Sequence, residues 1–156
     1  MAKKHALLGA SSSARWLVCT PSARLEAMFP DEQSPYAAEG TVAHDLAESI
    51  LRHKLEGKKA PKLDGYFTEM VEAVNRYVDI CEEKVNEARV RSSDAEVMIE
   101  AKLDFSRWVP EGFGTGDMVI VADGILEVID LKYGKGVPVS AIENTQMRLY
   151  ALGAYD

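Results

Sequence analysis

Apolar residues recur at helical spacing in two stretches of the chain's first hundred residues. Between Thr41 and Leu55 they fall three or four positions apart, the spacing that places side chains on one face of a helix. A longer stripe begins at Phe67, and Arg89 and Arg91 close it with charges that suit a helix C-terminus. The pattern predicts two helices that pack against a core.

Shorter helices are predicted ahead of the first stripe. Ser11-Ser12-Ser13 can cap one short helix, and Thr20-Pro21 supplies a cap and an N1 proline for the next. The polar, proline-containing segment from Asp31 to Ala38 is typical of a connecting loop, after which Gly40 opens the helix of the first stripe. A helical part is therefore expected over about residues 11–92.

The periodicity changes to strict alternation from Ala95 to Phe105, which predicts a half-exposed strand. Two further apolar segments flank Asp123-Gly124, a dipeptide that makes tight hairpin turns. Ser140-Ala141-Ile142-Glu143 forms a capping box that starts a last helix. We therefore expect an α/β fold in which N-terminal helices precede a three-stranded mixed or antiparallel sheet and a C-terminal helix, the last two over about residues 95–156.

Length and composition narrow the class of protein. With 156 residues and 47% hydrophobic content, the chain fits one domain with a proper core. No apolar run approaches the ~20 residues that span a membrane, so a cytoplasmic protein is expected. The net charge of −7 argues against a broad nucleic-acid-binding surface, so any contact with nucleic acid must be local or metal-assisted.

The predicted hairpin carries acidic residues toward one point. Asp117 begins one strand, while Asp130 and Lys132 lie two apart on the other and so share a face. Two carboxylates about 5 Å apart repel by roughly 3 kcal/mol at an effective dielectric constant of about 20, and a divalent cation would offset that repulsion. Hard oxygen ligands favour Mg²⁺ or Mn²⁺. The Lys132 ammonium can orient an attacking water or neutralise charge on a phosphate.

Simpler interpretations stand beside this metal site. The Asp130-x-Lys132 tripeptide is also typical of a strand that ends in solvated charges. His44 lies at the border of the first apolar stripe, where a histidine is either structural or able to reach a neighbouring cleft. Glu100 falls on the polar face of its strand, which favours a solvated side chain and leaves an accessory role in the metal cleft as the alternative.

Several of these segments together resemble a known family. Gly116-Asp117, Ile129-Asp130-Leu131-Lys132 and Gln146-x-x-x-Tyr150 are similar to the successive motifs of RecB-type nucleases in the PD-(D/E)xK superfamily. Gly40-Thr41-Val42-Ala43-His44 resembles the upstream helical motif of that group, whose histidine is an additional metal ligand. Arg15-Trp16-Leu17-x-Cys19-x-Pro21-Ser22-Ala23 is similar to a phage and prophage group of RecB-like exonucleases.

The resemblance implies a restriction-endonuclease-like core and a Mg²⁺- or Mn²⁺-dependent deoxyribonuclease of the phage exonuclease type, which hydrolyses DNA phosphodiesters with a metal-activated water. The alternative is an inactive DNA-binding or assembly module of phage recombination or replication on the same fold. Iron–sulfur relatives use four cysteines, so no cluster is expected from a chain that has only two. The residue roles that the resemblance implies are metal binding by His44, Asp117 and Asp130, catalysis by Lys132, and support of the site or the DNA by Gln146 and Tyr150.

The resemblance also bears on partners. In that superfamily the helix that carries the Gln-x-x-x-Tyr motif is followed by at least one more strand, whereas six residues remain here after Tyr150. An uncovered sheet edge invites strand addition from another chain. We therefore expect a homo-oligomer or a missing C-terminal segment to complete the sheet, with DNA and a phage recombination component as partners and no membrane association.

Overall fold

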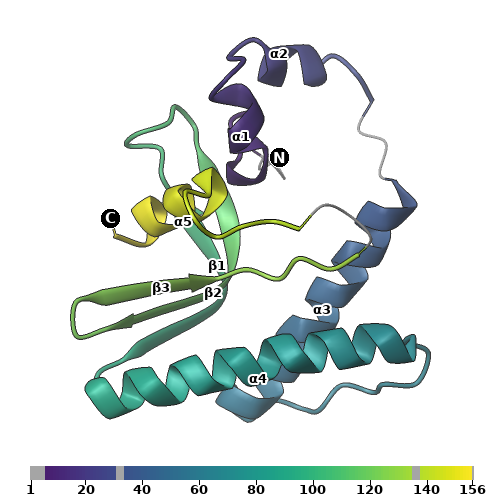
Figure 1. Ribbon diagram of the computed structural model, residues 1–156, viewed down its shortest axis with the longest axis vertical. Coiled ribbons are helices and arrows are strands. Elements are labelled where there is room, and N and C mark those ends of the chain that lie inside the picture. Colours follow the sequence, from purple (N-terminus) through teal and green to yellow (C-terminus); the bar gives the residue numbers. More distant parts are fainter. Residues whose placement is uncertain (1–5, 31–33, 135–137, 156) are drawn as a thin grey trace. The chain divides into compact units, whose positions relative to one another are not determined.

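The computed structural model describes residues 6–30, 34–134 and 138–155. Contacts within the chain define two compact units, one made of segments 1–32, 101–116 and 138–156 (unit 1) and the other of segments 33–100 and 117–137 (unit 2). The elements in chain order (Figure 1) are η1 (Ala10–Ser12), α1 (Ser13–Trp16), α2 (Ser22–Glu26), α3 (Pro35–Glu56), α4 (Thr68–Arg91), β1 (Glu96–Asp104), β2 (Phe113–Ala122), β3 (Ile125–Ile129) and α5 (Thr145–Tyr155).

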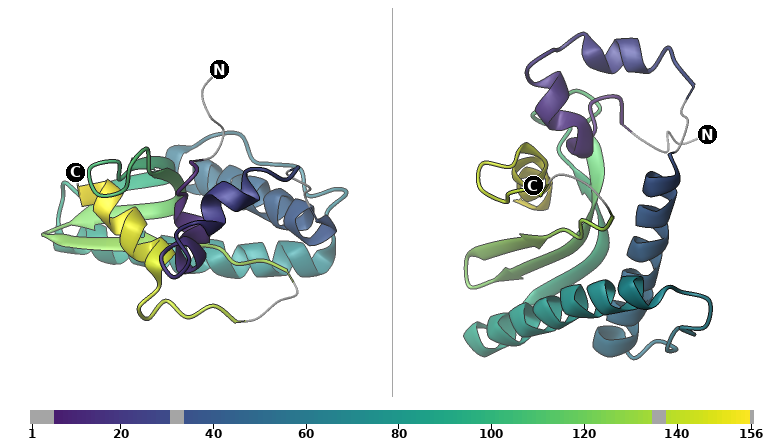
Figure 2. Two further views of the ribbon diagram at one scale, coloured as in Figure 1. Left: turned by 90° about the horizontal axis from the view of Figure 1, so that it is seen from above. Right: turned by 45° about the vertical axis from the view of Figure 1, so that its right-hand side comes forward.

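Unit 2 is organised around the two predicted apolar stripes. In α3 and α4 most stripe residues are buried and pack on one another and on the β2–β3 hairpin, which runs along α4 (Figures 1 and 2). Val42 and Phe67 are exceptions and are exposed. Their core contains, among others, Leu46, Ile50, Val74, Val78, Cys81, Val85, Met118, Ile120 and Leu131. The prediction of two core-facing helices is confirmed. No helix in the described segments has both the length and the apolar character needed to cross a membrane.

The first of these helices begins earlier than predicted. α3 starts at Pro35, inside the segment that the sequence analysis assigned to a loop, and the Ser34 hydroxyl accepts a hydrogen bond from the Ala37 amide. Serine at the N-cap followed by proline at N1 is a strong start signal, because proline lacks the amide hydrogen that would go unpaired there. The loop prediction is therefore wrong from Pro35 onward, and residues 31–33 lie outside the described residues.

The predicted hairpin is confirmed, but its bounds differ from the prediction. β2 begins at Phe113 rather than at Asp117, and β3 ends at Ile129, before Asp130 and Lys132. β2 and β3 pair antiparallel with Met118 opposite Ile129 and Ala122 opposite Ile125. Asp123 and Gly124 both have positive φ, of 51° and 72°, as the tight turn that suits twisted strands requires. The strand order β1-β2-β3 makes a three-stranded antiparallel sheet in the described part of the chain, with β3 at one edge.

Strand β1 departs from the predicted strict alternation at Glu100. This residue has a φ of 51°, a left-handed conformation that costs a non-glycine residue on the order of 1–3 kcal/mol. Ile99, just before it, belongs to the core of unit 2, whereas Leu103 packs against Gly153 of α5 in unit 1. Ile99 and Leu103, which precede and follow Glu100 on β1, are therefore buried in different units. A local break of this kind re-aims the side chain at the point where it occurs.

Unit 1 joins η1, α1 and α2 to the last helix. The buried Ser13 hydroxyl lies 2.6 Å from the hydroxyl of Thr145, at the start of α5. Within α5, Gln146 Nε2 donates to the hydroxyl of the buried Tyr150 over 3.2 Å. The prediction that Gln146 and Tyr150 share a helix face is confirmed.

The start of α5 differs from the predicted capping box. The Ser140 hydroxyl accepts from the amide of Ile142 rather than from that of Glu143, and the helix begins at Thr145. Asn144 takes the capping role, because its side-chain oxygen accepts from the amide of Met147. The serine therefore forms a local turn ahead of the helix.

Gly114 lies directly against the Tyr150 ring, which leads to a stability prediction. A Cβ at Gly114 would lie 2.7 Å from Tyr150 Cε1, closer than two carbons can approach. We expect Gly114→Ala to lower the free energy of unfolding by about 1–3 kcal/mol, measured by urea denaturation, since the buried ring must shift. Gly40→Ala is the matched control: its nearest neighbour is 3.9 Å away, and alanine should stabilise α3 by up to about 1 kcal/mol. An unchanged midpoint for Gly114→Ala would contradict this packing.

Candidate metal centre

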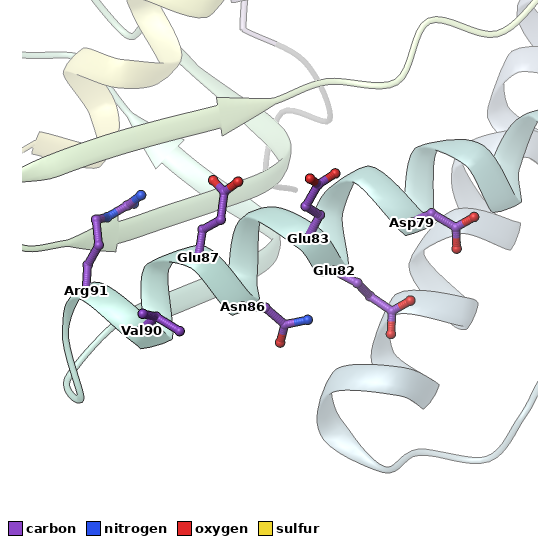
Figure 3. A pocket seen from close by; sticks show the side chains of 7 residues that line it. All are labelled: Asp79, Glu82, Glu83, Asn86, Glu87, Val90 and Arg91. Carbon is purple, nitrogen blue, oxygen red and sulfur yellow. The ribbon is translucent and has the colours of Figure 1, made fainter.

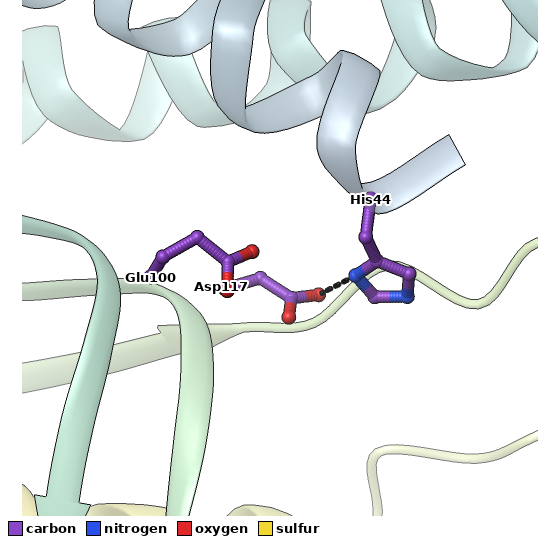
Figure 4. Close-up of side chains that lie close together, drawn as sticks. All are labelled: His44, Glu100 and Asp117. Carbon is purple, nitrogen blue, oxygen red and sulfur yellow. Dashed lines mark ion pairs between the residues drawn. The ribbon is translucent and has the colours of Figure 1, made fainter. Parts of the chain in front are cut away.

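Helix α3 carries His44 on the face that borders its buried stripe. The Nδ1 atom of His44 lies 3.3 Å from Oδ2 of Asp117, and about a third of the histidine side chain is exposed (Figure 4). The predicted border position therefore brings the imidazole to a carboxylate rather than to solvent. The two residues are 73 positions apart in sequence, so only the packing of α3 against the hairpin brings them together.

Asp117 is a buried carboxylate with structural as well as chemical partners. Asp117 is 8% exposed, and its Oδ2 atom accepts a 2.6 Å hydrogen bond from the backbone amide of Leu131. Leu131 in turn is buried in the core of unit 2. This hydrogen bond links β2 to the segment that follows β3, so that the segment passes beside Asp117.

Asp130 and Lys132 lie on this segment, beyond the last residue of β3. Lys132 Nζ is 2.5 Å from Asp130 Oδ2, and the carboxylate is 6% exposed while the lysine side chain is 46% exposed. The prediction that the two side chains lie together is confirmed. Burial raises the pKa of Asp130; the ion pair with Lys132 opposes that rise, and the charge of Asp117 adds to it.

Glu100 belongs to the same cluster. One ligand atom from each of His44, Glu100 and Asp117 lies within 4.8 Å of the other two, with Asp117 between the other side chains (Figure 4). The polar face of the strand predicted a solvated side chain for Glu100, yet the structure places it half-buried beside Asp117. The positive φ of Glu100 is the backbone feature that strict alternation could not anticipate.

Crowded carboxylates perturb the protonation of the cluster. Burial first, and then the charges of Asp117 and Glu48, raise the pKa of Glu100 to about 7. The hydrogen bond to Asp117 raises the pKa of His44 against the opposing effect of burial. Both shifts favour the protonated forms of these groups, and a cation that binds them would displace the protons.

The donor set fits a divalent cation. Ligands around one Mg²⁺ at about 2.1 Å lie no more than about 4.2 Å apart, so atoms already within 4.8 Å need only a small movement to close on an ion. Carboxylate oxygens are the donors that Mg²⁺ and Mn²⁺ prefer, and the imidazole nitrogen is a softer ligand that Mn²⁺ accepts more readily. His44, Glu100 and Asp117 could hold the ion, with Asp130 as a further carboxylate.

Gln146 and Tyr150 lie in unit 1, whereas the cluster lies in unit 2. Within its unit, Tyr150 is 5% exposed and packs on Gly114, so a structural role is clear. A contribution of either residue to the site stays a prediction.

A hollow on the exposed side of α4 offers a contrast (Figure 3). Most of its side chains are acidic, and its lining consists of Asp79, Glu82, Glu83, Asn86, Glu87, Val90 and Arg91. Lys54, in the last turn of α3, forms an ion pair with Glu82 over 2.5 Å. Such a surface repels phosphate, so this hollow is no candidate for nucleic-acid binding.

Two residues that are not among the predicted site residues lie next to the cluster. Glu48 and Arg52 follow His44 on α3 at intervals of four, so the three side chains share one face. Their four-residue spacing from His44 is visible in the sequence. Their proximity to Glu100 cannot be predicted from the sequence, because it depends on the break in β1.

Comparison with known proteins places the whole described part of the chain in one family. No solved structure matches the chain significantly. The model of DUF2800, described as a protein of unknown function, matches residues 5–156, a range that includes every residue of the cluster. The chain belongs to the DUF2800 family.

Proposed function

We propose that this protein is a divalent-metal-dependent deoxyribonuclease, of the exonuclease type, with a restriction-endonuclease-like core. The observation that carries the proposal is the cluster of the buried Asp117 with the half-buried His44 and Glu100, whose ligand atoms lie within 4.8 Å of one another. The sequence resemblance to RecB-type nucleases supplies the class of substrate. The antiparallel sheet flanked by helices is consistent with such a core.

Each residue of the site has a proposed task. Asp117, with Oδ2 fixed by the Leu131 amide, would hold the ion together with Glu100 and His44, and the buried Asp130 is a further carboxylate for it. A bound cation would supply a water of lowered pKa and neutralise charge on a phosphate. Lys132, which is partly exposed while paired to Asp130, is placed to donate to a phosphate oxygen or to orient a water.

A cleavage assay combined with calorimetry tests the proposal. The purified chain is incubated with linear double-stranded and single-stranded DNA in Mg²⁺, in Mn²⁺ and in EDTA, and Mn²⁺ binding is titrated on the same sample. We expect digestion that requires the metal. Metal binding without digestion would support the alternative of an inactive DNA-binding module on this fold, and the absence of both would overturn the metal site.

Loss of the imidazole should alter metal preference. His44→Ala removes the one nitrogen ligand of the cluster, and nitrogen favours Mn²⁺ over Mg²⁺. We expect the affinity for Mn²⁺ to fall by about tenfold or more and that for Mg²⁺ to fall less, with both measured by calorimetry. His53→Ala on the same helix is the matched control, since His53 Nδ1 lies 2.6 Å from the Lys58 carbonyl oxygen. Equal losses for both metals would assign His44 a structural role.

A further inference from the structure

Helix α3 presents a row of polar side chains at intervals of four, from His44 through Glu48 and Arg52 to Glu56. Residues four apart lie one above the other on a helix, so the row forms one stripe. His44 at one end contacts Asp117. Arg52, about two turns further along, reaches β1.

The Arg52 guanidinium makes three directed hydrogen bonds. Nε donates to Glu48 over 2.7 Å, and Nη1 donates to Glu56 over 2.9 Å. Nη2 donates to the backbone carbonyl oxygen of Ile99 over 3.1 Å. The two carboxylates fix the plane of the guanidinium, so the third bond holds the Ile99 carbonyl in a defined direction.

That carbonyl belongs to the peptide unit that joins Ile99 to Glu100. Glu100 has the positive φ that a non-glycine residue adopts only where its surroundings hold it there. A bond to the preceding carbonyl restrains the peptide plane on which this φ depends. Released from it, Glu100 would relax toward an extended strand, where its side chain leaves Asp117.

We propose that Arg52 is a positioning residue for the metal centre, which acts by bonding the Ile99 carbonyl and so holding Glu100 in the conformation that brings its carboxylate to Asp117 and His44. The inference rests on the proposed metal site. It also explains why Glu48 is kept in an ion pair: a free carboxylate next to Glu100 would add to the repulsion within the cluster.

The test is a double-mutant cycle read out by Mn²⁺ affinity. Arg52→Met keeps an unbranched apolar side chain and removes the guanidinium group. It should weaken Mn²⁺ binding by about tenfold or more, as loss of a group that positions a metal ligand typically does. Glu100→Gln should weaken it at least as much. If Arg52 acts through Glu100, adding Arg52→Met to Glu100→Gln has no further effect.

Two more variants separate positioning from stability. Glu56→Gln removes the charge of one ion pair but keeps an oxygen that can accept from Arg52 Nη1, so the guanidinium stays oriented toward Ile99. Mn²⁺ affinity should therefore stay within about twofold of the wild-type protein. Arg52→Lys keeps the charge without the planar fork, and we expect a partial loss of affinity. Equal losses for Arg52→Met and Glu56→Gln, or additive losses in the cycle, would overturn the proposal.

A metal-free measurement distinguishes failure of the inference from failure of the metal site. The three-bond coupling between the amide and Hα protons of Glu100, measured by NMR, reports its φ. We expect the coupling to change in Arg52→Met and to be unchanged in Glu56→Gln. If the protein binds no Mn²⁺ and the coupling still changes in Arg52→Met, Arg52 positions Glu100 but the proposed function is wrong. If the coupling is unchanged in Arg52→Met, the inference about Arg52 is wrong.

Discussion

Asp130→Asn is expected to abolish metal-dependent DNA cleavage while the metal-free protein keeps or gains stability. Loss of an outer partner of a metal ligand typically costs 10–100-fold in affinity or activity, so loss of a direct carboxylate should cost at least about 100-fold. Asparagine is nearly isosteric, and its oxygen can still accept from Lys132. The initial rate of digestion and the urea midpoint, both at pH 8, measure the two effects.

The sign of the stability change follows from linkage. Burial raises the pKa of Asp130, so the folded state binds this proton more tightly than the unfolded chain does. Stability is therefore lost as the pH rises through that pKa, and at pH 8 the ionised carboxylate opposes folding. Asparagine removes this cost. Asp79→Asn, which changes an exposed carboxylate of α4 in the same way, should leave both activity and midpoint near the wild-type values.

Two outcomes would contradict the assignment of Asp130. Digestion by Asp130→Asn at the wild-type rate would remove this carboxylate from the site. A large loss of stability would show that its ion pair with Lys132 serves the fold. Asp117 is a poorer subject for alanine, because Asp117→Ala leaves the Leu131 amide without its acceptor and confuses folding with function.

The features of the fold that were predicted correctly follow mostly from hydrophobic periodicity and from the residues that form turns. The stripes of α3 and α4, the Asp123-Gly124 turn and the pairing of Asp130 with Lys132 all depend on neighbours a few residues apart. The start of α3 was predicted wrongly, because the proline and polar residues around it are also typical of a loop. The Ser34-Pro35 pair is nevertheless a local signal that is sufficient to predict this helix start.

The place of Glu100 shows what local chemistry could not reveal. Its alternating neighbours are typical of a regular strand, and nothing in them signals a positive φ. The conformation depends on long-range contacts, among them the bond from Arg52 to Ile99, across 47 positions of sequence. The same holds for the approach of His44 to Asp117. Side-chain types indicated the candidates, and tertiary packing decided which of them meet.

Metal affinity is expected to rise steeply as the pH increases from about 6 through about 7. The pKa of Glu100 is raised to about 7, and that of His44 is raised above its usual 6.5, so both groups hold protons at pH 6. A cation binds only their deprotonated forms, so binding at pH 6 must release these protons. Each displaced proton changes the apparent affinity by up to about tenfold per pH unit, and two together by up to about 100-fold.

Calorimetry in buffers of different ionisation enthalpy counts the released protons directly. We expect the release to approach two protons per Mn²⁺ at pH 6, where both groups hold protons, and to fall as the pH rises. Glu100→Gln removes one of the two titrating groups, so its release at pH 6 should fall by about one proton while that of the matched variant Glu83→Gln, exposed on α4, stays unchanged. An affinity that is the same at pH 6 and pH 8.5 would mean that neither His44 nor Glu100 binds the ion, and the cation would then have to be held by Asp117 and Asp130 alone.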